Sequence, residues 1–162
     1  MICLDTLVLV WGVEGATGST GDEMVERTRT FFASLRDAAE VLMVPAPAVG
    51  EYLQRFDDEH RAHQLAALDR YFFIPAYDPP AAALAAELAR RPEVKALFKA
   101  AGSGGPDLAV DLQIVATAIV QGAETLLTPD LETFRILAGG RIKVSEVPRI
   151  PTQTRLLFDL DG

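Results

Sequence analysis

The segment Ile2-Cys-Leu-Asp5-Thr-Leu-Val-Leu-Val-Trp11 decides the fold class, because it is an apolar run interrupted by a single carboxylate. Its first part predicts a short buried strand over residues 2–5. Residues 7–11 either continue this strand or begin a helix, and periodicity alone does not decide between the two. An isolated carboxylate in an apolar setting is costly, so Asp5 needs a partner or a counter-charge.

Three further acidic residues occur in or beside apolar segments. Glu51 follows Val-Pro-Ala-Pro-Ala-Val-Gly, Asp111 lies early in an apolar run, and Asp130 follows Leu-Leu-Thr-Pro. Hard divalent cations such as Mg²⁺ take oxygen ligands, so a divalent cation is the simplest candidate for a shared counter-charge, whether one ion binds or two.

The composition predicts one globular domain with a sizeable core, because the chain has 162 residues, of which 49% are hydrophobic and 23% charged. The net charge of -8 and the pI of about 4.7 argue against a broad basic surface for nucleic acid. The single cysteine, Cys3, excludes a disulfide within the chain and is expected to be a small buried side chain. With no visible signal peptide or membrane helix, we expect a cytoplasmic protein that does not contact a membrane.

Strands and helices alternate along the sequence. We expect helices over residues 22–40, 48–71 with a break in the middle, 81–90, 93–100, 107–120 and 130–138, and further strands over 41–44, 72–74, 125–128 and 142–144. This alternation predicts a short, mostly parallel sheet of four to five strands flanked by helices. Asp5 and Asp130 then lie at the carboxyl ends of strands, where such sheets bind ligands, and Glu51 and Asp111 lie in the first turns of bordering helices.

Four blocks of the sequence resemble those of PIN domains, the fold of VapC-type ribonuclease toxins, and they occur in the same order. The blocks are Ile-Cys-Leu-Asp5-Thr-Leu-Val-Leu-Val-Trp, Val-Pro-Ala-Pro-Ala-Val-Gly-Glu51-Tyr-Leu, Asp111-Leu-Gln-Ile-Val-Ala-Thr-Ala and Leu-Leu-Thr128-Pro-Asp130-Leu-Glu-Thr-Phe134. Each block alone is unspecific, whereas their joint order is more specific. The resemblance implies an α/β, PIN-like three-layer sandwich, with a nuclease domain over residues 1–147 and a C-terminal tail over 148–162.

The same resemblance implies a metal-dependent endoribonuclease that hydrolyses RNA phosphodiester bonds with Mg²⁺ or Mn²⁺. It assigns the metal ligands and catalytic residues as Asp5, Glu51, Asp111 and Asp130, with the Thr6 and Thr128 hydroxyls orienting these carboxylates. It also implies the toxin of a toxin–antitoxin pair, blocked by a small antitoxin protein, and a homodimer. Candidate guides for the RNA phosphates are Lys95, Lys99, Arg135, Arg141 and Lys143.

Two departures from the family pattern favour a second interpretation. Leu7 stands where the family usually has Asn, and Pro129 stands where Asn is common. Neither change removes a carboxylate, but both alter the surroundings of the site. The alternative is a catalytically weak PIN-like module that binds RNA or a protein partner, and a phosphatase or nucleotide-binding domain is a third class.

Each acidic residue also has an ordinary structural interpretation. Asp5 could cap the helix that follows it, and Thr128-Pro129-Asp130 is a common helix start with Thr128 at the cap. A Glu51 near a helix start would interact favourably with the helix dipole. Asp107, one turn before Asp111, would be the N-terminal charge of that helix. Only the ordered set of four favours the metal site over these separate explanations.

Overall fold

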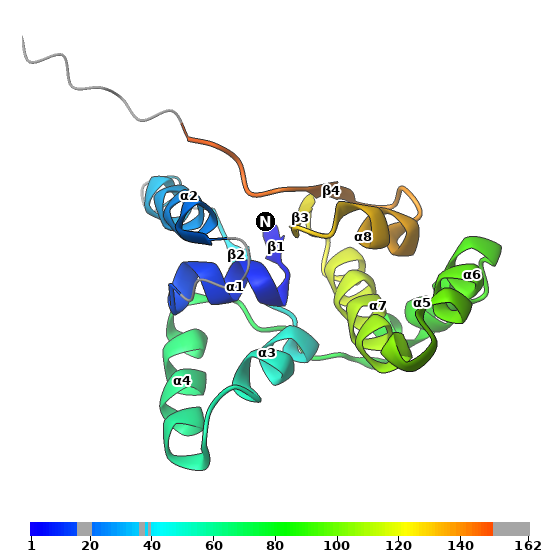
Figure 1. Ribbon diagram of the computed structural model, residues 1–162, viewed down its shortest axis with the longest axis horizontal. Coiled ribbons are helices and arrows are strands. Elements are labelled where there is room, and N and C mark those ends of the chain that lie inside the picture. The colour runs from blue at the N-terminus through cyan, green and yellow to red at the C-terminus, as the bar shows by residue number, and fades with distance from the viewer. Residues whose placement is uncertain (16–20, 36–37, 39, 151–162) are drawn as a thin grey trace, which may run out of the picture.

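The protein has an α/β fold built on four parallel strands, as seen in a computed structural model that describes residues 1–15, 21–35, 38 and 40–150 (Figure 1). The strand order is β2-β1-β3-β4, with every neighbouring pair parallel. The strands are β1 (Ile2–Leu4), β2 (Leu42–Met43), β3 (Thr125–Leu127) and β4 (Lys143–Ser145). Ile2 pairs with Leu42 on one side and with Thr125 on the other.

Helices connect and flank these strands. They are α1 (Thr6–Val13), α2 (Gly21–Ser34), α3 (Ala46–Leu53), α4 (Asp58–Tyr71), α5 (Pro79–Ala89), α6 (Pro92–Ala101), the 3₁₀ turn η1 (Gly102–Gly104), α7 (Gly105–Val120) and α8 (Leu131–Ala138). The predicted alternation of strands and helices is confirmed, including the break between α3 and α4. The apolar run after Asp5 is a helix, because Asp5 ends the extended chain and caps α1.

Several expected boundaries differ from the structure. Residues 72–74 form no strand, since Phe73 makes only a single bridge to Met43 and Pro75, which has no N–H group, follows at once. The sheet therefore has four strands among the described residues. The second helix ends at Ser34 instead of reaching residue 40, and α7 begins at Gly105 instead of 107.

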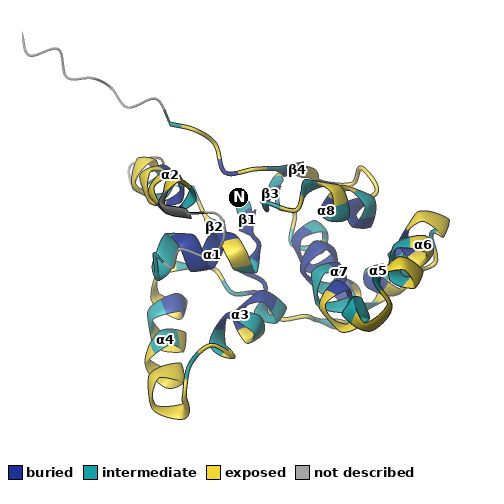
Figure 2. Cartoon of the chain, viewed as in Figure 1, coloured by how far each residue is buried: buried dark blue, intermediate teal, exposed yellow. Residues whose placement is uncertain are grey.

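The core lies between the sheet and its two layers of helices (Figure 2). Helix α7 is central, with buried side chains along most of its length, whereas the outer faces of α4, α5 and α6 are exposed. Cys3 is fully buried, as predicted, and burial raises the pKa of its thiol. Gly12 permits the close approach of α1 and α2, because a Cβ there would overlap the Phe32 ring.

After β4 the chain crosses to α2. Val147 is buried, Ile150 packs against the core, and Arg149 pairs with Glu23 at 2.8 Å. The segment expected to be a tail therefore contacts the domain up to residue 150, and residues 151–162 lie outside the described part of the chain. Within the described residues, no helix combines the length and apolar character needed to cross a membrane.

Candidate active site

The topology creates a switch point between β1 and β3. From β1 the chain moves to β2 on one side, whereas β3 leads to β4 on the other side. Because crossovers between parallel strands are right-handed, the two connections place their helices on opposite faces of the sheet. Ligands of such sheets bind outside the carboxyl ends of the strands at this point. Asp5 directly follows β1 there, and Thr128 directly follows β3.

Asp5 is buried, with 6% of its surface exposed, and both of its carboxylate oxygens accept hydrogen bonds. Oδ1 accepts from the Thr6 backbone N–H at 2.6 Å, which is the cap of α1. Oδ2 accepts from the Thr128 hydroxyl at 2.9 Å, across the two neighbouring strands. The capping interpretation of Asp5 is therefore correct but incomplete, since the cap uses only one of the two oxygens.

Thr128 connects Asp5 to the start of α8. Its fully buried hydroxyl donates to Asp5 and accepts from the Asp130 backbone N–H at 3.1 Å. Asp130, which is exposed, caps α8 by accepting from the Thr133 backbone N–H at 3.1 Å. The cap of this helix is thus Asp130 and not Thr128.

Glu51 contacts Thr6, whose hydroxyl donates to the Glu51 Oε2 at 2.6 Å. The expected position of Glu51 near a helix start is wrong, because α3 begins at Ala46 and ends at Leu53. Near the C-terminal end of a helix the dipole disfavours a carboxylate. Glu51 therefore has no favourable dipole interaction to explain it, and its hydrogen bond with Thr6 ties it to Asp5.

Asp111 lies in the second turn of α7 and is half-buried. Its pKa is raised to about 7, mainly by burial and then by the negative charges of Asp5, Glu51, Asp130 and Asp107. Asp107 lies in the first turn of α7, as expected for its N-terminal charge.

The pKa of Asp5 is raised to about 6 by its burial, in part against the hydrogen bonds from Thr128 and Thr6. The charges of Glu51 and Asp130 also raise this pKa. The four acidic residues therefore lie in one electrostatic neighbourhood, although they come from different elements far apart in the sequence. Figure 1 shows α3 and the N-terminal end of α1 facing α7 across the ends of the strands.

The donor set fits a hard divalent cation, because all four side chains offer carboxylate oxygens. Across the described residues, however, no three Asp, Glu, His or Cys side chains stand in an arrangement that holds one metal ion as they are placed. The hydrogen bonds explain this difference, since Thr6 engages Glu51, Thr128 and Thr6 engage Asp5, and the Thr133 amide engages Asp130. Binding a cation would require these side chains to turn toward one another.

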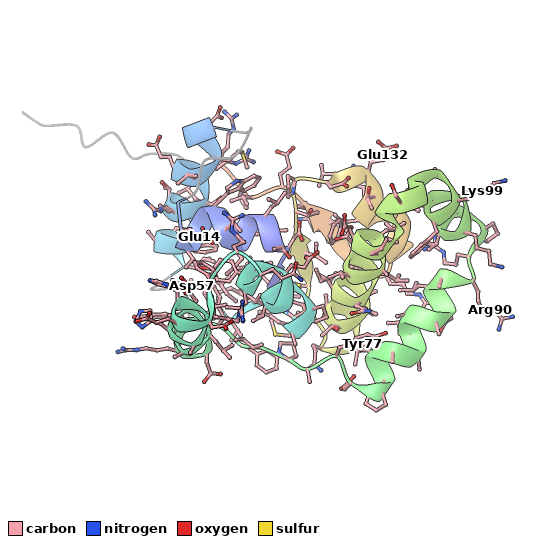
Figure 3. All side chains as sticks on the ribbon, turned by 60° about the horizontal axis from the view of Figure 1, so that its bottom comes forward. Glu14, Asp57, Tyr77, Arg90, Lys99 and Glu132 are labelled. Carbon is pink, nitrogen blue, oxygen red and sulfur yellow. The ribbon has the colours of Figure 1, made fainter. Side chains whose placement is uncertain are left out.

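One contact near the site had no signal in the sequence. Arg91 donates to the backbone carbonyls of Ile136 at 2.8 Å and Leu137 at 3.3 Å, which holds the far end of α8. No sequence signal indicated this contact between α8 and the N-cap residue of α6. Of the expected phosphate guides, Arg141 pairs with Glu87, and Lys99 projects outward from α6 (Figure 3). Leu7, the departure beside Asp5, is 47% exposed and does not fill the core.

The fold is similar to that of a chain in the crystal structure of VapBC2 from Rickettsia felis bound to a DNA fragment from their promoter. The likeness has a TM-score of 0.59 and 16% sequence identity, and it covers 90% of this chain and 98% of the other. The fold is PIN-like. At this identity the likeness concerns the fold alone, and no protein-family model and no curated protein matches the sequence.

Proposed function

We propose that this protein is a metal-dependent endoribonuclease that hydrolyses RNA phosphodiester bonds with Mg²⁺ or Mn²⁺. The observation that carries the proposal is the convergence of Asp5, Glu51, Asp111 and Asp130 at the switch point of the sheet. Like charges that are partly removed from water repel strongly. A bound cation would offset the repulsion within this cluster, so the cluster favours cation binding. A metal-dependent hydrolase needs such a cation.

The carboxylates would hold the cation, and the hydroxyls would position the carboxylates. When bound, the cation neutralises charge on the phosphate and activates a water molecule. Thr128 fixes Asp5 and the start of α8 together, and Thr6 fixes Glu51. Burial and the neighbouring carboxylates raise the pKa of Asp111 to about 7 in the metal-free site, and a bound cation would offset this repulsion.

The structural likeness to a chain of VapBC2 supports a role as the toxin of a toxin–antitoxin pair. In that role a small antitoxin protein would cover the acidic site and block access of RNA. The homodimer and the cytoplasmic location remain predictions from the sequence.

Cleavage of a broad RNA pool tests the function directly. The wild type is expected to cut RNA with Mn²⁺ or Mg²⁺ and not with EDTA, and Asp5→Asn is expected to lose at least about a hundredfold in rate. Asp69→Asn, an exposed change on α4, is the control and should cut like the wild type. Failure of the wild type to cut any RNA with either metal would overturn the proposal.

A second candidate is a PIN-like module that binds RNA or a protein partner without cutting. Two observations favour it, namely the exposed Leu7 beside Asp5 and the separation of the carboxylates by their hydrogen bonds. Calorimetric titration with Mn²⁺ distinguishes the candidates. The nuclease binds Mn²⁺ in the wild type and more weakly in Asp130→Asn, whereas the module shows no difference between the two.

A further inference from the structure

An open recess of about 390 Å³ lies next to the acidic site, between α6, α7 and α8. Asp111 and Asp130 line one part of it, so the recess continues directly from the carboxylates described above. Its volume is at the lower end of the range of roughly 300–1,000 Å³ for small-ligand sites. The recess is therefore large enough for one ring system but not for a folded segment of a partner.

The walls of the recess combine small apolar side chains with carboxylates. Helix α6 contributes Leu97, Ala100 and Ala101, and α7 contributes Leu108. Ala100 and Ala101 leave the space open, and at Gly104 even an added Cβ would meet no atom within 4 Å. Such a surface suits the flat, weakly polar face of an aromatic ring.

The charges of the recess disfavour an anionic occupant. All of its lining residues are described and none is a cation, and Figure 3 shows Lys99 of α6 projecting outward. A phosphate group would therefore meet only negative charge. The carboxylates of the recess accept hydrogen bonds, so a neutral group that carries N–H donors fits beside the cation site.

We propose that this recess holds one nucleobase of a single-stranded RNA, with guanine preferred, an inference that rests on the proposed ribonuclease function. The base would lie against Ala100 and Ala101 while the phosphate of the same strand reaches the cation site at Asp111 and Asp130. A base in a duplex has its Watson–Crick edge occupied, so only an unpaired base presents the donors that this recess requires.

Asp107 provides the preference for guanine. It lies at the exposed rim of the recess, in the first turn of α7, and its carboxylate accepts hydrogen bonds but donates none. Guanine presents two parallel donors, N1–H and the N2 amino group, to the two oxygens of a carboxylate. Cytosine and adenine each present one amino group, and uracil presents only N3–H between two carbonyl oxygens that repel a carboxylate, so uracil should bind most weakly.

Nucleoside binding tests the recess without dependence on metal or on cleavage. Guanosine and uridine carry no phosphate, and each is titrated into the full chain while the alanine methyl signals are followed by NMR. Guanosine is expected to shift the Ala100 and Ala101 methyl signals and to bind roughly tenfold more tightly than uridine. Asp107→Asn is expected to remove this preference.

A matched pair of substitutions on α6 locates the binding. Ala100→Leu fills the recess, whereas Ala96→Leu adds the same side chain at another exposed position of the same helix. Guanosine binding should weaken at least about tenfold in Ala100→Leu and stay unchanged in Ala96→Leu. Circular dichroism checks that both variants keep the helical content of the wild type.

The two proposals fail in different ways. If guanosine and uridine bind equally, or if Ala100→Leu leaves guanosine affinity unchanged, the proposed guanine site is wrong even if the protein cuts RNA. If guanosine binds at Ala100 but the protein cuts no RNA, the recess is supported as a base-binding site and the proposed ribonuclease function is wrong. If both hold, cleavage next to guanine should show a raised KM in Ala100→Leu with little change in kcat.

Discussion

At the scale of single residues, the Thr128 hydroxyl holds the site together because it has one proton to give. It donates that proton to Asp5, so its lone pairs remain for the Asp130 amide. The pair of contacts joins the end of β1, which Asp5 follows, to the segment after β3 that leads to Asp130.

Thr128→Val keeps the shape of this side chain and removes both hydrogen bonds. We expect the free energy of unfolding to fall by about 1–3 kcal/mol, because the buried Asp5 oxygen loses its partner. The pKa of Asp5 should also rise, since the Thr128 hydrogen bond lowers it. Urea denaturation at constant pH measures the first effect.

The matched control is Thr117→Val on α7. Thr117 is equally buried, but its hydroxyl donates only to the Gln113 carbonyl of its own helix, at 2.8 Å. Thr117→Val should therefore lower the free energy of unfolding much less than Thr128→Val does. Equal losses in the two variants would show that Thr128 has no special role at the site.

The pH dependence of stability follows from Asp5 with a definite sign. Its pKa rises from 3.8 in the unfolded chain to about 6 in the fold, so the folded state binds more protons in this window. Stability of the metal-free protein should therefore fall as pH rises from about 4 to about 7, by roughly 3 kcal/mol from Asp5. Asp111, with its pKa raised to about 7, acts in the same direction.

Denaturation curves in EDTA between pH 4 and pH 8 measure this slope. Asp5→Asn cannot ionise at this position, so its curve should be flatter and its stability at pH 8 should exceed that of the wild type. A wild-type stability that increases steadily over the whole range would contradict the assigned pKa values.

At the scale of elements, α8 is held at both ends. Asp130 caps its start, Gly139 ends it in the left-handed conformation with φ 58°, and Arg91 donates to its last carbonyls. These contacts hold the C-terminal end of α8, and Asp130 holds its start.

Replacing Arg91 by Met should lower the free energy of unfolding by about 1–3 kcal/mol, because the carbonyls of Ile136 and Leu137 lose a charged donor. Arg90→Met is the control, since Arg90 is exposed and projects outward in Figure 3. Thermal unfolding of the two variants gives the comparison, and an Arg90→Met loss as large as that of Arg91→Met would refute the role of Arg91.

The elements also show which local signals can be read from a sequence. Gly139 ends α8, as residue type alone predicts, whereas its start is capped by Asp130 instead of the expected Thr128. The start of α3 was missed because Pro47 lies inside its first turn, where a missing N–H costs nothing, and this moved Glu51 toward the helix end. The strand expected at residues 72–74 was wrong because pairing with β2 extends over a single bridge.

At the scale of the whole molecule, parallel topology is what brings the four acids together. The rule that parallel strands bind ligands at their carboxyl ends predicted the meeting of Asp5 and Asp130 from the sequence. The partner of each carboxylate was not predictable, because Thr6 and Glu51 are 45 positions apart and Asp5 and Thr128 are 123 apart. The recess between α6, α7 and α8 depends on packing angles, for which the sequence carries no local signal.

Divalent cations should stabilise the entire fold, since they offset the repulsion among carboxylates that folding brings together. At a concentration of one hundred times the Kd, linkage predicts a gain of about 2.7 kcal/mol, which raises the Tm by roughly 5–10 °C in a domain of this size. Mn²⁺ added at pH 8 should produce this shift in the wild type and in Asp69→Asn. Asp130→Asn can still cap α8 but lacks the charge, so its Tm should respond weakly. An equal Tm shift in Asp130→Asn would place the cation elsewhere on the molecule. No Tm shift in any variant would show that the carboxylates bind no cation, which contradicts the proposed metal-dependent nuclease.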